Sequence, residues 1–197
     1  ELAFYLFRDA IRNRELLHLS REQVFLDKVV IPVYVDLTTL ADLKDPFQGA
    51  EYEFREFTLE DLQSKKLTFL TRSRYCRAKH RIKKGVRGFA LTKGSEIVGD
   101  IWCSAPNGPN VSLWSHDFER LGIPFTGEDA IAADMYIEPA YRGKKLAIPL
   151  HLALELILKR EGRRRLYSFY YEDNLLAKPM HWILKVKELP KFHESRF

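Results

Sequence analysis

The residues best suited to chemistry lie in one short run, from Met135 to Ala147. The run reads as a strand that passes through a turn containing Arg142, Gly143, Lys144 and Lys145 and then enters a long apolar helix. A helix start leaves about four backbone N–H groups without partners and carries about half a positive charge, so it can bind an anion. The three cations add formal charge at the same place. The turn is therefore predicted to bind a phosphate group.

Pro149 fixes where this helix starts. A proline is tolerated in the first turn of a helix, because an N–H group at that position has no partner inside the helix. The spacing predicts a helix that starts near Leu146, with free N–H groups over residues 143–148. The basic turn and the helix start then coincide.

The pattern over residues 137–147, Ile-x-Pro-x-Tyr-Arg-Gly-Lys-x-x-Ala, resembles motif A of the GNAT superfamily of acyl-CoA-dependent N-acyltransferases. The core of that motif is Arg/Gln-x-x-Gly-x-Gly/Ala, and Arg142 and Ala147 match its first and last positions. Lys145 stands where the family usually has a glycine. A glycine often serves close backbone approach or a positive φ, which other residues adopt at a cost of about 1 kcal/mol or more. Lys145 would either weaken cofactor binding or point its ammonium towards pyrophosphate or solvent.

The predicted elements follow the GNAT order over residues 50–197. Thr58 is expected to cap one helix, and Gly85 to end a basic helix over residues 72–84. In order, the elements are a strand at 53–57, these two helices, a hairpin at 87–92 and 96–103, a strand at 130–137, the motif-A helix ended by Gly162, a strand at 166–171, a helix opened by Asn174, and a strand near 189–192. The resemblance implies an α/β (α+β) domain, whose mixed, mostly antiparallel sheet is splayed between strands 4 and 5 and flanked by helices.

Asn174-x-x-Ala177 resembles GNAT motif B, in which the asparagine follows the fifth strand. Many members carry a tyrosine seven residues later that protonates the leaving thiolate of coenzyme A, and His181 occupies that position here. An imidazole titrates near neutral pH and would be able to supply this proton. The alternative, which the residues favour, is that His181 is a packed or solvated residue. Lys185-Val186 replaces the Gly-Phe that usually ends the motif.

The resemblance implies acetyl-CoA as cosubstrate, no metal, and transfer of the acetyl (acyl) group to an amine by direct attack. Backbone N–H groups of the fourth strand would pair with the pantetheine arm and polarise the thioester carbonyl. That strand maps to Met135, Tyr136 and Ile137. The remaining implied cofactor-binding residues are Arg142, Gly143, Lys144, Lys145, Leu146, Ala147, Asn174 and Ala177.

An attacking amine must be neutral, and an ammonium with a pKa of about 10 is mostly protonated at neutral pH, so a base has to remove its proton. Asp134 on the fourth strand and Glu172 just after the fifth are the candidate bases, because each lies near the predicted split. A base that acts through water stays open as an alternative, as does an ordinary strand-end role for both carboxylates. No residue pattern identifies the acceptor.

The composition fits one domain with an extension, since 197 residues of which 46% are hydrophobic can bury a sizeable core. Residues 50–197 would form the acyltransferase domain. Residues 1–49 would form a helix–strand extension, with a basic amphipathic helix over 2–18 and a β-rich run over 28–37. This extension would pack on the core or form a homodimer contact, and the alternative is peripheral contact of residues 2–18 with a membrane surface.

The chain contains no apolar run near the roughly 18 residues that cross a bilayer, and it shows no secretory segment, although its start at Glu1 indicates truncation. Cys76 and Cys103 are far apart, without the spacing of a disulfide framework or a zinc site. These features predict a cytoplasmic protein.

The net charge of +5, with eight Lys or Arg residues and one His over residues 72–87, raises the possibility of nucleic-acid binding. Aromatic residues are sparse in this run, which favours a solvated helix face. A third interpretation is that some of these cations bind an anionic acceptor or the 3′-phosphate of coenzyme A. His151 and Glu155 share a helix face but lack a His-Glu-x-x-His pattern, so they are expected to be structural.

Three hypotheses follow. The first is a GNAT-type N-acetyltransferase with an unidentified acceptor. The second is a GNAT-like acyl-CoA-binding or regulatory protein without turnover, suggested by Lys145, His181 and the altered end of motif B. The third is a basic module that associates with nucleic acid or membranes.

Overall fold

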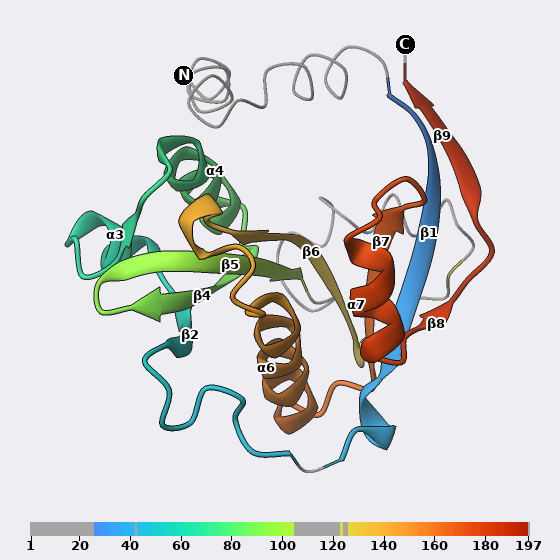
Figure 1. Ribbon diagram of the computed structural model, residues 1–197, viewed down its shortest axis with the longest axis horizontal. Coiled ribbons are helices and arrows are strands. Elements are labelled where there is room, and N and C mark those ends of the chain that lie inside the picture. The colour runs from blue at the N-terminus through green and yellow to red at the C-terminus, as the bar shows by residue number, and fades with distance from the viewer. Residues whose placement is uncertain (1–25, 42, 105–122, 124–125, 197) are drawn as a thin grey trace.

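The computed structural model describes residues 26–41, 43–104, 123 and 126–196 (Figure 1). The predicted helix over residues 2–18 and most of the connection from 104 to 128 lie outside the described residues. The strands are β1 (Leu26–Asp36), β2 (Glu53–Phe57), β3 (Thr68–Phe69), β4 (Arg87–Lys93), β5 (Glu96–Ser104), β6 (Asp129–Ile137), β7 (Arg165–Tyr171), β8 (Lys187–Glu188) and β9 (Phe192–Arg196). The helices are η1 (Leu37–Thr39), α3 (Leu59–Gln63), α4 (Arg72–Lys83), η2 (Pro139–Tyr141), α6 (Ala147–Arg160) and α7 (Ala177–Ile183).

Local signals in the sequence fix several helix ends. The Thr58 side chain accepts a hydrogen bond from the N–H of Asp61, and the Asp61 carboxylate accepts one from the N–H of Thr58, which completes a capping box at α3. Gly85 and Gly162 follow α4 and α6 with φ of 75° and 79°. Glycine reaches this left-handed conformation without a Cβ clash, so it ends a helix readily.

The strands described form one mixed sheet in the order β2-β4-β5-β6-β7-β1-β8, with β3 beside β5 and β9 beside β1. All neighbours are antiparallel except β6 with β7 and β3 with β5. β6 pairs with β7 only from Asp129 to Ile131, whereas it stays paired with β5 as far as Ile137. The sheet therefore opens after Ile131, and the expected sheet splayed between its fourth and fifth core strands is confirmed.

The β-rich run expected in the N-terminal extension forms β1, which lies inside the sheet. Residues Val30–Asp36 pair with Arg165–Tyr171 of β7, and the other edge of β1 carries β8 and β9. The described part of residues 1–49 thus shares one sheet with residues 50–197. The single strand expected near 189–192 is instead the two strands β8 and β9, which Pro190 separates because it has no N–H group for a strand ladder.

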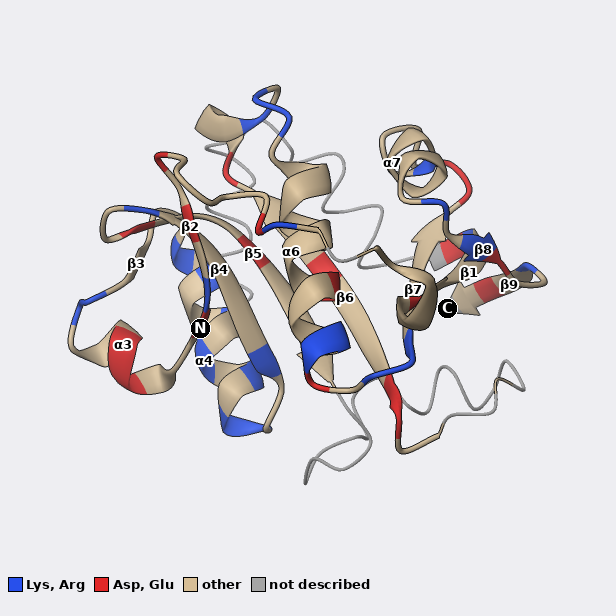
Figure 2. Cartoon of the chain, turned by 90° about the horizontal axis from the view of Figure 1, so that it is seen from below, with Lys and Arg blue, Asp and Glu red and all other residues tan. Residues whose placement is uncertain are grey.

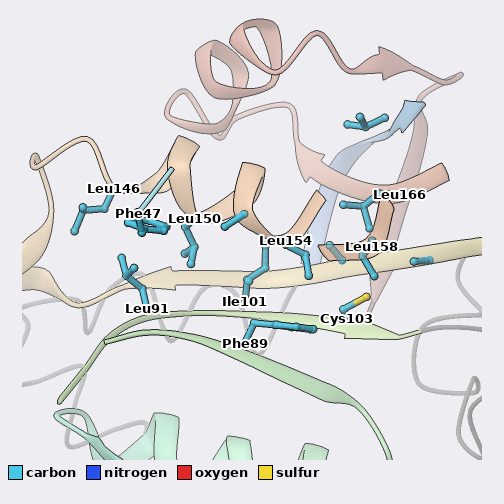
Figure 3. Packing of buried hydrophobic residues seen from close by; sticks show 14 of the residues in the cluster. Phe47, Phe89, Leu91, Ile101, Cys103, Leu146, Leu150, Leu154, Leu158 and Leu166 are labelled. Carbon is cyan, nitrogen blue, oxygen red and sulfur yellow. The ribbon is translucent and has the colours of Figure 1, made fainter. Parts of the chain in front are cut away.

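The two faces of the sheet are covered by different helices (Figures 1 and 2). On one face, α6 packs Leu150, Leu154 and Leu158 against strand residues such as Phe89 and Ile101 (Figure 3). Each fully buried Leu contributes about 1.5–3 kcal/mol through burial. On the other face α4 covers a second cluster, which contains Phe57, Leu62, Leu67, Phe69, Ala78, Val86, Ala90, Ile97 and Trp102. No helix in the described part of the chain is long and apolar enough to cross a membrane.

Gly88 provides a test of this second cluster. A Cβ at position 88 would lie 2.6 Å from Cζ of Phe57 and 2.9 Å from Cη2 of Trp102. We expect Gly88→Ala to lower the free energy of unfolding by about 1–3 kcal/mol, because buried rings would have to move. Urea denaturation measures this, with Glu53→Ala on the exposed edge of β2 as the control. Equal stability of the two variants would contradict the packing described.

Candidate functional site

The turn before α6 leaves backbone N–H groups unengaged. α6 begins at Ala147, with Leu146 as its N-cap and Pro149 in its first turn, as predicted. Leu150 is the first residue of the helix whose N–H bonds back, to the carbonyl of Leu146 at 3.0 Å. Within the described chain, the N–H groups of residues 143–148 make no backbone hydrogen bond. These groups are therefore available to an anion at the helix start.

Two residues of this turn have left-handed backbone conformations. Gly143 has a φ of 79° and Lys145 a φ of 60°. Lys145 thus adopts the backbone shape for which a glycine would be suited, at a cost of about 1–2 kcal/mol. The lysine at the glycine position of the motif is accommodated by strain, and its side chain is exposed.

The side chains of Arg142 and Lys144 contact groups next to the turn. Nε of Arg142 donates to the carbonyl of Ile137 at 3.1 Å, and its guanidinium lies 5.6 Å from the ring centre of Tyr136. Nζ of Lys144 lies 4.6 Å from the ring centre of Tyr141. Both cations are exposed, so the turn presents positive charge to solvent.

The turn follows the free edge of β6 after the short helix η2. Tyr136 and Ile137 pair with Asp100 and Gly99 of β5 on one side. Beyond Ile131, the other side of β6 faces no partner strand among the described residues. Met135 and Ile137 pack their side chains against the core under α6. The backbone from Met135 to Ile137 is therefore open towards β7, as predicted for the splayed edge.

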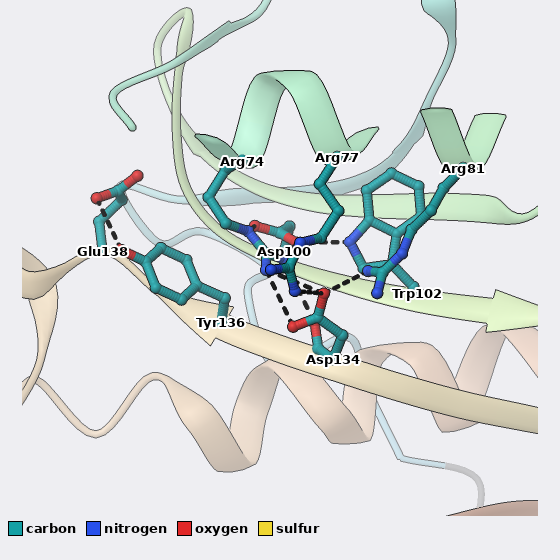
Figure 4. Close-up of polar contacts among 8 residues, drawn as sticks. All are labelled: Arg74, Arg77, Arg81, Asp100, Trp102, Asp134, Tyr136 and Glu138. Atoms are coloured by element: carbon teal, nitrogen blue, oxygen red, sulfur yellow. Dashed lines mark hydrogen bonds and ion pairs between the residues drawn. The ribbon is translucent and has the colours of Figure 1, made fainter. Parts of the chain in front are cut away.

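Asp134 lies where β6 departs from regular pairing (Figure 4). Its φ is 51°, and the β5–β6 register shifts opposite it, between Asp100 and Trp102. Nη1 of Arg74 donates to both carboxylate oxygens of Asp134 at 3.0 Å, and Nη1 of Arg77 donates at 3.0 Å to Oδ2. Arg81 donates to the same Oδ2 atom. The carboxylate is thus held by three guanidinium groups.

These arginines come from one face of α4, because residues 74, 77 and 81 are spaced by three and four. Nε of Arg74 also donates to Oδ2 of Asp100 at 3.1 Å, and Nε1 of Trp102 donates to Oδ1 at 2.7 Å. We call these five residues the arginine–aspartate cluster: Arg74, Arg77, Arg81, Asp100 and Asp134. Asp100 is 1% exposed, so the cluster places ionised groups inside the protein, where unpaired charge is costly.

The cluster decides how Asp134 can act. Burial opposes its ionisation, but the charges of Arg74, Arg81 and Arg77 outweigh burial and hold the pKa of Asp134 well below its usual range. A carboxylate with such a pKa and with both oxygens bonded accepts a proton poorly. The geometry therefore favours a structural role for Asp134, which holds the bulge of β6, over a role as a base.

The structure adds two elements that the sequence analysis did not identify, the cluster and Glu138. Glu138 directly follows β6, on the face of Tyr136, and its Oε2 accepts from Oγ1 of Thr71 at 2.9 Å. Oε1 is buried without a hydrogen bond among the described residues, and burial raises the pKa of Glu138. The arginine spacing in α4 was the available signal. The expectation of a solvated helix face is wrong for Arg74 and Arg81, which are buried, whereas Arg77 is partly exposed.

The second candidate base, Glu172, stands in a different environment. It follows β7, its N–H donates to the carbonyl of Val29, and its carboxylate accepts from Nζ of Lys191 at 3.0 Å. The side chain is exposed. If the β6–β7 register is continued from Ile131 opposite Tyr167, Glu172 stands across the split from Tyr136.

His181 belongs to α7, and its side chain is buried. It is 5% exposed, its ring stacks on Tyr170 with 4.7 Å between ring centres, and its Nδ1 has no hydrogen bond among the described residues. Burial, followed by the charge of His151, lowers the pKa of His181 to about 4. His181 is therefore neutral at pH 7, which fits the packed role better than that of a proton donor. Nδ1 of His151 bonds Oε1 of Glu155 at 2.8 Å.

Asn174 and Ala177 meet at the start of α7. Oδ1 of Asn174 accepts from the N–H of Ala177 at 3.2 Å, which satisfies a donor at the helix start. This contact accounts for the Asn-x-x-Ala spacing locally. Across the described ranges, no group of three or more His, Cys, Asp or Glu side chains is placed to hold a metal ion.

The strain in the turn can be measured. We expect Lys145→Gly to raise the free energy of unfolding by about 0.5–1 kcal/mol, because relief of the left-handed strain exceeds the added entropy of the unfolded chain. Gly143→Ala is the converse test. No heavy atom lies within 4 Å of the added Cβ, so the left-handed φ of 79° is the only feature that disfavours alanine there. We expect it to lower stability by about 1–2 kcal/mol. Chemical denaturation measures both, and a destabilised Lys145→Gly protein would contradict the strain.

Burial of neutral His181 predicts a pH dependence. The unfolded chain takes up a proton near the ordinary pKa of 6.5, whereas the folded chain does so only near 4, so stability falls as the pH falls between these values. From pH 7 to pH 5 we expect His181 to account for a loss of about 1–2 kcal/mol. The His181→Phe protein keeps a ring on Tyr170 and should lose less. Identical urea midpoint shifts in both proteins would refute the assignment.

No protein-family model matches the chain, and no curated protein is similar to it. Solved structures are similar in fold. The GCN5-related glucosamine N-acetyltransferase region of a fungal multi-domain GH3 β-N-acetylglucosaminidase superposes with a TM-score of 0.64 at 12% identity, over 94% of this chain and 23% of the fungal chain. A GNAT-family acetyltransferase from Colwellia psychrerythraea gives 0.54 at 13% identity, over 93% and 59% of the two chains.

An aminoglycoside N-acetyltransferase in complex with CoA superposes with a TM-score of 0.51 at 14% identity, over 74% of this chain and 98% of its own. The chain thus spans less than two thirds of the fungal and Colwellia proteins and nearly all of this smaller enzyme. All three are similar to this chain in fold, although their sequence identity to it is low. Together with the opened β6–β7 edge and the motif-A turn, they show that this chain has the fold of the GNAT acetyltransferases.

Proposed function

We propose that this protein is an N-acyltransferase that moves an acetyl (acyl) group from acetyl-CoA to an amine acceptor. One observation carries the proposal: the free edge of β6 leads, through the short helix η2, into a turn whose N–H groups are unengaged and flanked by cations. A cosubstrate whose extended pantetheine arm leads to a pyrophosphate fits this succession. The neighbour solved with CoA supports a cosubstrate of this type.

In this proposal each end of the site binds a different part of acetyl-CoA. The N–H groups of residues 143–148 and the side chains of Arg142 and Lys144 hold the pyrophosphate. The backbone from Met135 to Ile137 pairs with the pantetheine arm, since this edge of β6 has no strand beside it among the described residues. An N–H group near the bulge at Asp134 polarises the thioester carbonyl.

The acceptor amine then attacks the carbonyl carbon, a C–N bond forms, and the C–S bond to coenzyme A breaks. The ammonium form must first lose a proton. Asp134 is engaged by three guanidiniums and His181 is buried and neutral, so we assign this proton to Glu172 or to water. The amine loses its second proton to water as the amide forms, and the thiolate takes one proton from water, so each turnover that starts from the ammonium form releases one proton in total.

Calorimetric titration of the protein with acetyl-CoA, followed by measurement of thiol release over a panel of amines, tests the proposal. The panel should contain amino acids, amino sugars, polyamines and peptides. Binding with acceptor-dependent thiol release is the expected result. Binding without release from any acceptor would indicate the acyl-CoA-binding alternative, and no binding would reject both.

The cations of the turn give a sharper test. Arg142→Ala and Lys144→Ala should each raise the Kd for acetyl-CoA by at least about 10-fold and together by at least about 100-fold, because each removes a charged contact worth about 1.5–3 kcal/mol. Lys83→Ala removes an exposed cation of α4 and serves as the control. Titration calorimetry measures the Kd of each variant and of the unchanged protein. An unchanged Kd for the double variant would remove the turn from the cofactor site.

A further inference from the structure

Arg77 is the outermost member of the arginine–aspartate cluster. Its side chain is 32% exposed, compared with 7% for Arg74 and 10% for Arg81. Among the described residues its guanidinium makes one hydrogen bond, from Nη1 to Oδ2 of Asp134. A guanidinium carries five N–H donors in a planar fork, so most of those on Arg77 remain to be satisfied.

The carboxylates of the cluster do not face outward. Asp100 is buried against Arg74 and Trp102, and the oxygens of Asp134 already accept bonds from Arg74, Arg77 and Arg81. The cluster contains three guanidiniums and two carboxylates. Its exposed edge is therefore cationic, although acids lie directly beneath it (Figure 4).

Glu138, a further acid beside the cluster, does not cancel this charge (Figure 4). Glu138 stands on the far side of the Tyr136 ring, and its Oε2 is bonded by Thr71 and Tyr136. It is buried, and burial favours its neutral form. Arg77 is left as the charged group that the cluster offers to a molecule arriving from outside.

The position of Arg77 relates it to the reacting end of the proposed cosubstrate. Asp134, to which it is bonded, is the residue immediately before the open backbone of Met135 to Ile137. A group bound to Arg77 would thus lie about one side chain from the thioester. At such a distance, the same small molecule can place an amine at the carbonyl and an anionic group on Arg77.

We propose that Arg77 binds an anionic group of the acceptor, so that the acceptor is an amine with a carboxylate or a phosphate close to its nitrogen. This inference rests on the proposed acyltransferase function. Carboxylate and phosphate oxygens both match the planar fork of a guanidinium, and such charge-assisted bonds are stronger than neutral ones. An amine without an anionic group forms no ion pair with Arg77. A second positive charge on such an amine would be repelled by the guanidinium.

The test compares acceptors that differ only in the anionic group. Amino acids are measured against the amines left when the carboxylate is removed, and glucosamine 6-phosphate against glucosamine, with acetyl-CoA and thiol release as the readout. We expect kcat/KM to be about 10- to 100-fold higher for the anionic member of at least one pair. The pair that discriminates identifies carboxylate or phosphate as the group.

Arg77→Gln should abolish this preference mainly through the KM for the anionic acceptor, because Arg74 and Arg81 still hold Asp134 and the bulge of β6. Lys79→Gln is the matched control, because Lys79 is an exposed cation two residues further along α4. Equal kcat/KM within both pairs would overturn the inference while leaving the transferase intact. A raised KM for acetyl-CoA in Arg77→Gln with unchanged preference would overturn it too, and would point to the cosubstrate's phosphate. Absence of thiol release from every acceptor would instead reject the transferase proposal itself.

Discussion

The structure depends on how β6 leaves β7 while staying paired with β5. The departure requires a bulge, and the residue at the bulge, Asp134, adopts a left-handed backbone that costs about 1–2 kcal/mol. Hydrogen bonds from three guanidiniums of α4 hold its side chain and offset this cost. The open edge of β6, along which acetyl-CoA is proposed to bind, therefore depends on α4, which lies on the opposite face of the sheet from α6.

One of these arginines, Arg74, connects the bulge to the turn before α6 through Tyr136. The ring of Tyr136 lies 4.7 Å from the guanidinium of Arg74 and 5.6 Å from that of Arg142. One aromatic side chain thus contacts a cation of the buried cluster and a cation of the exposed turn, which favours a fixed spacing between them. The basic character of the chain is divided in this way between buried groups that shape the strand and exposed groups beside the helix start.

Local signals predicted much of this architecture. Thr58, Gly85, Pro149 and Gly162 each act within one helical turn, and each marks the helix end that the structure shows. The place of β1 in the sheet was not predictable, because the strands that pair with it lie far along the chain. The inward arginines were also missed: a charged face looks alike in sequence whether its partner is water or, as here, carboxylates on β5 and β6. Those partners are revealed only by tertiary contact.

The position of β1 has a consequence for how the chain folds. Its partner β7 follows it by more than a hundred residues, and β1 in turn supports β8 and β9. Closing a loop of that length has a large entropic cost before any strand contact compensates for it, so pairings of this kind form late and slowly. During synthesis the first strand of the sheet must therefore wait, with both edges unpaired and exposed to other chains, until the fifth core strand has emerged.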